Sequence, residues 1–125
     1  MNLLLDTHAL LWWLDDNTAL SAKARRAIRA ERNAVFVSAA TAWEISIKQA
    51  LGKLQAPNDL EEALRVNRFR PLFITLNHAL TAGRLPRHHD DPFDRMLVAQ
   101  AQTERLTLVT RDPQMSLYHV PTLWT

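Results

Sequence analysis

The amino-acid sequence predicts an α/β fold with a central, mostly parallel sheet. Short runs of apolar or β-branched residues alternate with longer segments of helical periodicity, as in repeated strand–helix–strand units. Such units connect parallel strands and place helices on both faces of the sheet. We therefore expect residues 1–125 to form a single domain, a three-layer α/β/α sandwich around about five short strands.

The first four elements follow from local composition. Residues 2–5 are apolar and predict a short buried strand, and residues 7–14 are apolar nearly all round and predict a helix. Ser21 is a good N-cap for a helix over residues 22–32, which carries arginines on its polar side. Residues 34–37 are β-branched and aromatic and predict the second strand.

The middle of the chain continues the alternation. Residues 38–51 have helical periodicity, and Gly52 is well placed to end that helix. Asp59, or the asparagine before it, caps a helix that we expect to reach residue 69, with two glutamates in its first turn. Residues 71–76 predict the third strand.

The last third of the chain contains two more helices and two more strands. A short helix, opened by Asn77 or the histidine after it, is expected to end near residue 83. Asp91 caps a helix over residues 92–105, which has a proline at its first position. Residues 107–110 predict the fourth strand, and residues 118–120 are the candidate fifth.

Composition restricts the possible classes of protein. The chain has no cysteine, so disulfides and thiolate metal ligands are excluded and a reducing compartment is compatible. The N-terminal apolar run carries Asp6 and no basic residue, and no segment is long enough to span a membrane. We therefore expect a cytoplasmic protein. Arginine heavily outnumbers lysine, which suits phosphate recognition or simply reflects a GC-rich genome.

Two acidic residues follow predicted strands directly. Asp6 comes after the first strand, and Asp112 lies just past the fourth. In a parallel sheet, ligands bind beyond the carboxyl ends of the strands. Chain position alone therefore places both carboxylates at the edge where a site is expected.

Two more carboxylates approach the same edge from helices. Glu44 lies in the first half of the helix that leaves the second strand, on a stripe of apolar residues. Its alternative role is a surface ion pair with Lys48, four residues later. Asp94 lies in the first turn of the helix that feeds the fourth strand, and its alternative role is to stabilise that helix start together with Asp91.

Four carboxylates at one edge predict a metal site. They cannot all stay ionised without cations, because like charges raise one another's pKa. Oxygen ligands without cysteine select hard ions such as Mg²⁺ or Mn²⁺. An acidic cluster that binds such ions is typical of enzymes that cleave phosphodiesters.

Four sequence blocks resemble those of a known family. The blocks are LLLDTHALLWWL, SAATAWEISIKQALGKL, HHDDPFDRMLVAQA and LVTRD. In this order, and with the elements between them, they resemble the PIN-domain ribonucleases over essentially the whole chain. Within that family they are most similar to the VapC-type toxins of bacterial toxin–antitoxin pairs.

The resemblance implies both a site and a function. The family's catalytic, metal-binding carboxylates fall on Asp6, Glu44, Asp94 and Asp112, and Asp91 could shape the site. The implied activity is a Mg²⁺- or Mn²⁺-dependent endoribonuclease that cuts tRNA or rRNA and so inhibits translation. The implied partners are RNA, a second copy of the chain in a homodimer, and a cognate antitoxin that forms a hetero-oligomer with the toxin. A catalytically silent PIN-like module that binds RNA or protein is the alternative.

Further polar residues are expected to support the carboxylates. Thr7 and Thr110 could hold a metal-bound water, and Ser38 could donate a hydrogen bond nearby. Arg95 and Arg111 flank site carboxylates and could contact the RNA backbone, with plain ion pairs to those carboxylates as the alternative.

Histidine and tryptophan side chains have less certain roles. We expect His88 and His89 to lie in a basic loop near RNA or on plain solvated surface, since no third nitrogen ligand is evident. His8 is close to Asp6 in the chain but is expected to pack or cap. The three tryptophans at positions 12, 13 and 43 are expected to be mostly core, with some of their surface facing a partner.

Overall fold

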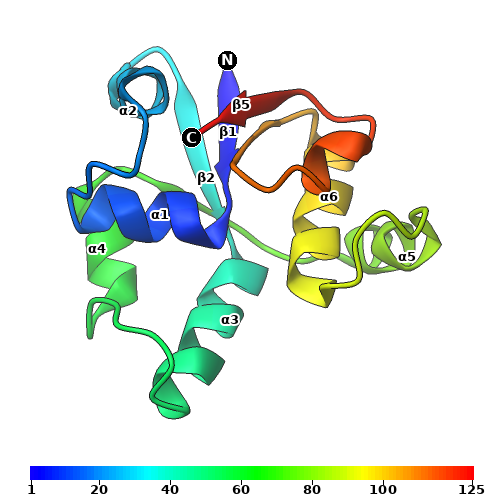
Figure 1. Cartoon of the computed structure of the whole chain (residues 1–125), viewed down its shortest axis with the longest axis horizontal. Coiled ribbons are helices and arrows are strands. Elements are labelled where there is room, and N and C mark those ends of the chain that lie inside the picture. The colour runs from blue at the N-terminus through cyan, green and yellow to red at the C-terminus, as the bar shows by residue number, and fades with distance from the viewer.

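A computed structural model describes all residues, 1–125. Its centre is a five-stranded sheet with the order β3-β2-β1-β4-β5, in which every neighbouring pair is parallel. The expected three-layer α/β fold is therefore confirmed (Figure 1). The strands are β1 (Asn2–Leu5), β2 (Ala34–Ser38), β3 (Arg70–Leu72), β4 (Thr107–Thr110) and β5 (Thr122–Trp124).

Six α-helices and one 3₁₀ helix connect the strands. They are α1 (Thr7–Leu14), α2 (Ala22–Arg29), α3 (Ala39–Ala50), α4 (Leu60–Val66), α5 (Leu76–Arg84), α6 (Pro92–Glu104) and η1 (Met115–Leu117). No helix among them is long and apolar enough to cross a membrane.

The two faces of the sheet bury separate apolar clusters. Successive side chains of β1 point to opposite faces, because side chains alternate along a strand. Leu3 and Leu5 join α1, α2 and Ile45 of α3 on one face, whereas Leu4 joins α6 and η1 on the other. Burial on both faces explains why β1 is apolar at every position after Asn2.

Several predicted helix boundaries are confirmed by side-chain caps. Ser21, Asp59 and Asp91 each accept a hydrogen bond from a backbone N–H in the first turn of their helices. Gly52 follows α3 with φ of 69°, a left-handed conformation that glycine adopts without strain. These caps place α3 and α6, which carry two of the candidate site residues.

Other boundaries differ from the prediction. The predicted fifth strand at residues 118–120 is wrong, because β5 lies at Thr122–Trp124, where Leu108 N–H donates to Pro121 O. The third strand is shorter than expected, since Thr75 caps α5 and the helix takes over residues assigned to the strand. Thr75, and not Asn77 or His78, therefore opens α5.

Two helices end earlier than expected. The second helix stops at Arg29, because Ala30 is extended with ψ of 120°. The fourth stops at Val66, and Arg68 then turns the chain with a left-handed φ of 59° so that Phe69 can be buried. Neither difference moves a candidate site residue.

The strand order creates a switch point between the two central strands. From β1 the chain winds outward to β2 and β3, and from β4 it winds in the opposite direction to β5. The connections on the two sides diverge there and leave a crevice at the carboxyl ends of β1 and β4. Figure 1 shows the ends of α1, α3 and α6 around the carboxyl end of β1.

Candidate active site

Asp6 lies at the switch point, directly after β1. Its backbone N–H donates to Val109 O of β4 at 3.1 Å, and its Oδ1 accepts the Ala9 N–H at 2.8 Å as the N-cap of α1. The side chain is fixed by these bonds and is buried. Asp6 therefore combines a capping role with a carboxylate that faces the crevice.

Glu44 is the second carboxylate, and it is buried in the first half of α3. Thr7 Oγ1 donates to Glu44 Oε1 at 2.6 Å, and Lys48 Nζ lies 2.6 Å from Glu44 Oε2. The Glu44–Lys48 ion pair, considered above as the alternative role of Glu44, is therefore present, and both residues line the candidate site. Because each of its oxygens accepts a hydrogen bond, Glu44 is held in the site by Thr7 and Lys48 and adds its negative charge to the cleft.

Asp91 and Asp94 have different roles at the start of α6. Asp91 Oδ1 accepts the N–H groups of Phe93 at 2.8 Å and of Asp94 at 3.1 Å, so Asp91 is the cap. Asp94 therefore does not cap the helix, which was the alternative role considered for it. Its Oδ2 lies 3.0 Å from Nε2 of His89, a residue of the loop between α5 and α6.

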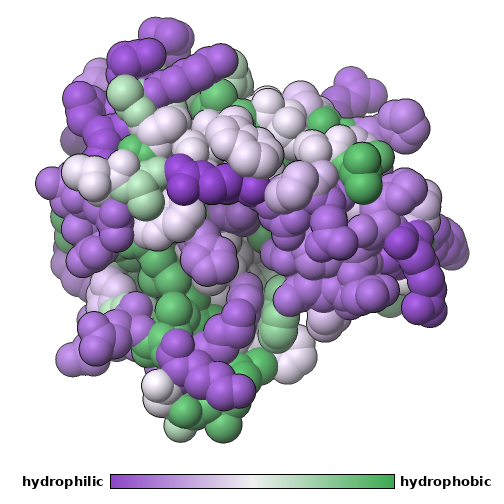
Figure 2. All heavy atoms as spheres, viewed as in Figure 1, coloured by the Kyte–Doolittle hydropathy of each residue, from purple (hydrophilic) through white to green (hydrophobic).

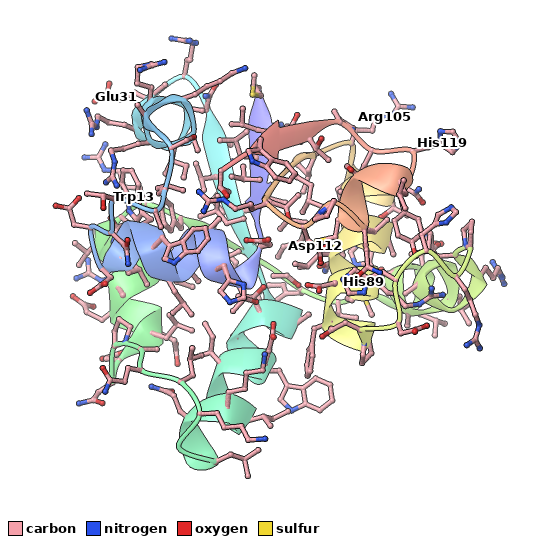
Figure 3. The ribbon with its side chains drawn as sticks, viewed as in Figure 1. Trp13, Glu31, His89, Arg105, Asp112 and His119 are labelled. Carbon is pink, nitrogen blue, oxygen red and sulfur yellow. The ribbon has the colours of Figure 1, made fainter.

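Asp112 completes the set from the loop after β4. Its N–H donates to Thr110 Oγ1 at 3.1 Å, and its Oδ1 accepts the Gln114 N–H at 2.9 Å. Its Oδ2 lies 2.7 Å from His89 Nε2. Figure 3 shows His89 and Asp112 side by side at the centre of the molecule.

The four carboxylates share one cleft of about 380 Å³. Five acidic and only two permanently cationic side chains line it, so its charge is strongly negative. Figure 2 shows the molecule from one side. Hydrophilic side chains dominate the middle of that face, whereas apolar surface gathers beside α3 and α4. The lining residues are Asp6, Thr7, His8, Trp12, Glu44, Lys48, Asp91, Asp94, Arg111 and Asp112.

The electrostatics of the cleft favour a bound cation. Burial and the neighbouring charge of Asp91 raise the pKa of Asp94 to about 7. Burial also raises the pKa of Asp6 above its ordinary value, although the hydrogen bond from Ala9 N–H opposes the shift. Carboxyls that resist ionisation next to one another are stabilised in the charged form by a divalent ion. The all-oxygen carboxylate set of Asp6, Asp94 and Asp112 fits Mg²⁺ or Mn²⁺.

Comparison with known proteins decides the family. The PIN domain model matches residues 3–121, which is nearly the whole chain. The chain belongs to the PIN-domain family. PIN domains are generally nucleases, so the family places this chain among the hydrolases. No curated protein sequence matches it significantly.

Solved structures share the fold of this PIN domain at low sequence identity. VapBC2 from Rickettsia felis, bound to a DNA fragment from their promoter, is 13% identical with a TM-score of 0.73, covering 100% of this chain and 99% of that one. DNA-bound VapBC from Salmonella typhimurium is 16% identical with a TM-score of 0.66 and coverage of 99% and 98%. FitAcB from Neisseria gonorrhoeae is 21% identical with a TM-score of 0.64 and coverage of 97% and 96%.

The supporting hydroxyls of the PIN domain have distinct positions. Thr7 faces the cleft and donates to Glu44. Thr110 is buried between the Asp6 carboxylate, whose pKa its hydrogen bond lowers, and Met115 Sδ at 3.3 Å. The Thr110 hydroxyl thus lies between two possible acceptors, the Asp6 carboxylate and the Met115 sulfur. Ser38 does not line the cleft; its Oγ accepts the Ala40 N–H as the N-cap of α3.

Neither arginine has the expected surroundings. Arg95 donates to the carbonyls of residues 82, 85, 86 and 89 and does not line the cleft, so its expected contact with RNA stays an untested prediction. Arg111 lines the cleft, but its guanidinium donates to Ala19 O and Thr125 O and lies 4.6 Å from the ring centre of Trp12. Neither forms an ion pair with an aspartate or glutamate side chain, and their donors are directed at main-chain oxygens.

The PIN domain also places aromatic side chains that sequence reasoning misjudged. His89 is neither solvated surface nor a free basic group: its side chain is 10% exposed and lies against two site carboxylates. His8 packs against Trp12, as expected, with tilted rings whose centres are 5.7 Å apart, and it also lines the cleft. Trp43 is 63% exposed and not core, with its ring packed edge-on against Phe93.

Proposed function

We propose that this PIN domain is a metal-dependent endoribonuclease that acts as the toxin of a toxin–antitoxin pair. The observation that carries the proposal is the meeting of Asp6, Glu44, Asp94 and Asp112 in one cleft at the switch point of the sheet. The structural likeness to VapBC and FitAB proteins, which are complexes in the solved structures, supports the toxin role.

Asp6, Asp94 and Asp112 are the proposed direct ligands of Mg²⁺ or Mn²⁺. A bound ion of this kind lowers the pKa of water and stabilises the charge that develops on a phosphodiester during hydrolysis. Glu44 has a donor on each of its oxygens, so we assign it to the network that holds the site through Thr7 and Lys48. Because both Glu44 oxygens already have donors, three carboxylates remain as direct ligands, and we propose that they bind one ion and not two.

The cations of the cleft have separate proposed roles toward RNA. Lys48 reaches into the cleft from α3 with 42% of its side chain exposed, so its ammonium can approach a backbone phosphate. Arg111 is held by carbonyls and Trp12, so it contributes positive potential from a fixed position. Positive groups beside an acidic metal site orient the phosphodiester without reading its sequence.

The proposed partners are RNA, an antitoxin and a second copy of the chain. The apolar surface beside α3 and α4 borders the acidic cleft, so an antitoxin segment lying on it would reach the site (Figure 2). The start of α5 exposes Phe73, Leu76 and Leu80, which suits a contact between two copies. tRNA or rRNA is the proposed substrate, and its cleavage would inhibit translation.

Cleavage of RNA by purified protein tests the proposal. We expect cleavage of tRNA or rRNA with Mg²⁺ or Mn²⁺ and none with a chelator. Asp6→Asn and Asp94→Asn should each lower the rate about 100-fold or more, since they remove proposed ligands. Asp90→Asn is the matched control, because Asp90 is exposed in the loop just before α6, which carries Asp94. This variant should cleave like the wild type.

The alternative function is a catalytically silent module that binds RNA or protein. Binding of RNA or an antitoxin without cleavage of any cellular RNA would favour it. Equal cleavage by the wild type and both variants would instead show that the carboxylates are not the active site.

A further inference from the structure

His89 comes from the loop between α5 and α6 and reaches two of the proposed metal ligands. Its Nε2 lies 2.7 Å from Asp112 Oδ2 and 3.0 Å from Asp94 Oδ2. One potential ligand atom from each of these three residues falls within 4.8 Å of the other two. This clustering allows two roles: an imidazole nitrogen that binds the ion, or an N–H that donates to the carboxylates.

The other ring nitrogen decides between these roles. Asp91 N–H donates to His89 Nδ1 at 3.1 Å. A backbone N–H can only donate, so Nδ1 must present its lone pair and cannot carry a proton. The single proton of the neutral ring is therefore on Nε2. A protonated Nε2 has no lone pair for a metal ion, but it can donate to Asp112 Oδ2 at 2.7 Å, with Asp94 Oδ2 3.0 Å away.

The surrounding contacts hold the ring in this orientation. His89 N–H donates to Tyr118 Oη at 3.0 Å, and Tyr118 O–H donates to Pro86 O at 2.7 Å. Arg95 Nη1 donates to His89 O at 3.2 Å. A flipped ring would place carbon atoms against the Asp91 N–H and both carboxylates and so lose all three contacts.

A second histidine shows the same arrangement outside the cleft. Thr75 N–H donates to His78 Nδ1 at 3.0 Å, and His78 Nε2 lies 2.9 Å from Glu104 Oε2. In each case a backbone N–H fixes the tautomer and the far nitrogen donates to a carboxylate. His78 has one carboxylate partner and joins α5 to α6, whereas His89 has two partners that belong to the candidate metal site.

We propose that His89 is a positioning residue that donates from Nε2 to Asp112, with Asp94 beside the same ring edge, and is not a ligand of the metal ion. The inference rests on the proposed function, because it assigns those two carboxylates to the ion. Donation from Nε2 holds the Asp112 carboxylate in place, close to Asp94, before the ion binds. It also leaves an all-oxygen ligand set, which favours Mg²⁺ and Mn²⁺ over Zn²⁺.

Nitrogen NMR and electron spin resonance test the tautomer and the absence of ligation. In ¹⁵N spectra of the metal-free protein, we expect a protonated Nε2 and an unprotonated Nδ1 for His89, with the same tautomer after Mg²⁺ is added. Electron spin-echo spectra of the Mn²⁺-loaded protein should show no directly bound nitrogen. A protonated Nδ1, or a nitrogen bound to Mn²⁺ that disappears in His89→Gln, would overturn the proposal.

Metal affinity measured by calorimetry provides the second test. His89→Leu should weaken Mg²⁺ binding by about 10–100-fold, since it removes the donor. His89→Gln keeps an N–H near the position of Nε2 and should recover most of the affinity, while His88→Leu in the exposed neighbour is the matched control. Equal losses in the leucine and glutamine variants, with both folded by NMR, would contradict the donor role. If the wild type bound neither ion, the proposed function would fail, and the metal-free ¹⁵N spectrum would still decide the tautomer.

Discussion

Lys48 Nζ lies 2.6 Å from Glu44 Oε2, one helical turn along α3, so the acidic cleft carries a cation of its own. The hydrogen bond to Glu44 raises the pKa of Lys48, which keeps the ammonium charged throughout the neutral range. Glu44 is the buried member of the pair and depends on Lys48 and Thr7 for its partners. The pair is thus part of the site and also part of what stabilises the fold.

Removal of the Lys48 ammonium should destabilise the protein. In Lys48→Met, the buried Glu44 carboxylate loses its cation, and we expect the free energy of unfolding in urea to fall by about 1–3 kcal/mol. The double variant with Glu44→Gln should lose less than the sum of the two single variants, because it leaves no unpaired charge. Strictly additive losses would show that the two side chains do not interact in solution.

Asp94 should make the metal-free stability depend on pH. Its folded pKa of about 7 lies above the ordinary value of 3.8, so the folded state binds the proton more tightly. The resulting stabilisation is complete below pH 3.8 and is lost as the pH rises through 7. In a chelator at pH 8, we expect Asp94→Asn to be more stable than the wild type by about 1–3 kcal/mol, as measured by urea unfolding.

The advantage of Asp94→Asn should shrink as the pH falls. As the pH falls from 8 to 5, the folded Asp94 takes up its proton, so the difference between the two proteins should become smaller, and it should vanish only below pH 3.8. Asp90→Asn, in the exposed neighbour, should show no such trend. An Asp94→Asn advantage that is the same at both pH values would mean that the carboxyl titrates normally.

Arg95 should matter for stability and not for RNA contact. Its guanidinium joins the end of α5, the loop before α6 and Tyr118 through donors to several carbonyls. Lysine cannot reproduce this planar set of donors, so Arg95→Lys should lower the free energy of unfolding by about 1–3 kcal/mol. Arg87→Lys, in an exposed residue of the same loop, should change it very little. A normal stability with a large loss of RNA affinity would restore the original assignment of Arg95.

The exposed apolar start of α5 should control self-association. Leu76 and Leu80 lie one helical turn apart and are 76% and 48% exposed. If they form the contact between copies, the pair of substitutions Leu76→Asp and Leu80→Asp should convert a dimer into a folded monomer in sedimentation experiments. Leu117→Asp, at a residue 60% exposed in η1, should leave the dimer intact. A dimer that survives the α5 substitutions would place the interface elsewhere.

Chain order and caps were enough to predict most of the fold. Asp91 with Pro92, Ser21 and Gly52 mark helix ends by local chemistry, and the structure confirms them. The fifth strand was misplaced because Tyr118 and Val120 favour a strand locally, whereas β5 is defined by its pairing with β4 across an intervening loop. Local composition contains no information about such pairing.

The candidate site was predicted less completely than the fold. Positions after strands and in first helical turns located the carboxylates, since topology alone brings those positions together. The surroundings of Arg95 and His89 depend on the path of the loop before α6, which periodicity does not describe. The one available signal for His89 was its spacing of two residues from the Asp91 cap, which allows the Asp91 N–H to reach its ring.

The strand order also determines when the site can exist during synthesis. Asp6 is made before the other site carboxylates, but its N–H donates to Val109 O of β4, and Asp112 follows that strand. A growing chain that has not yet reached β4 lacks both the central strand pair and the last carboxylate. The cleft can therefore assemble only after β4 and Asp112 have been made, so translation from β1 through α6 proceeds without the activity proposed for the finished site.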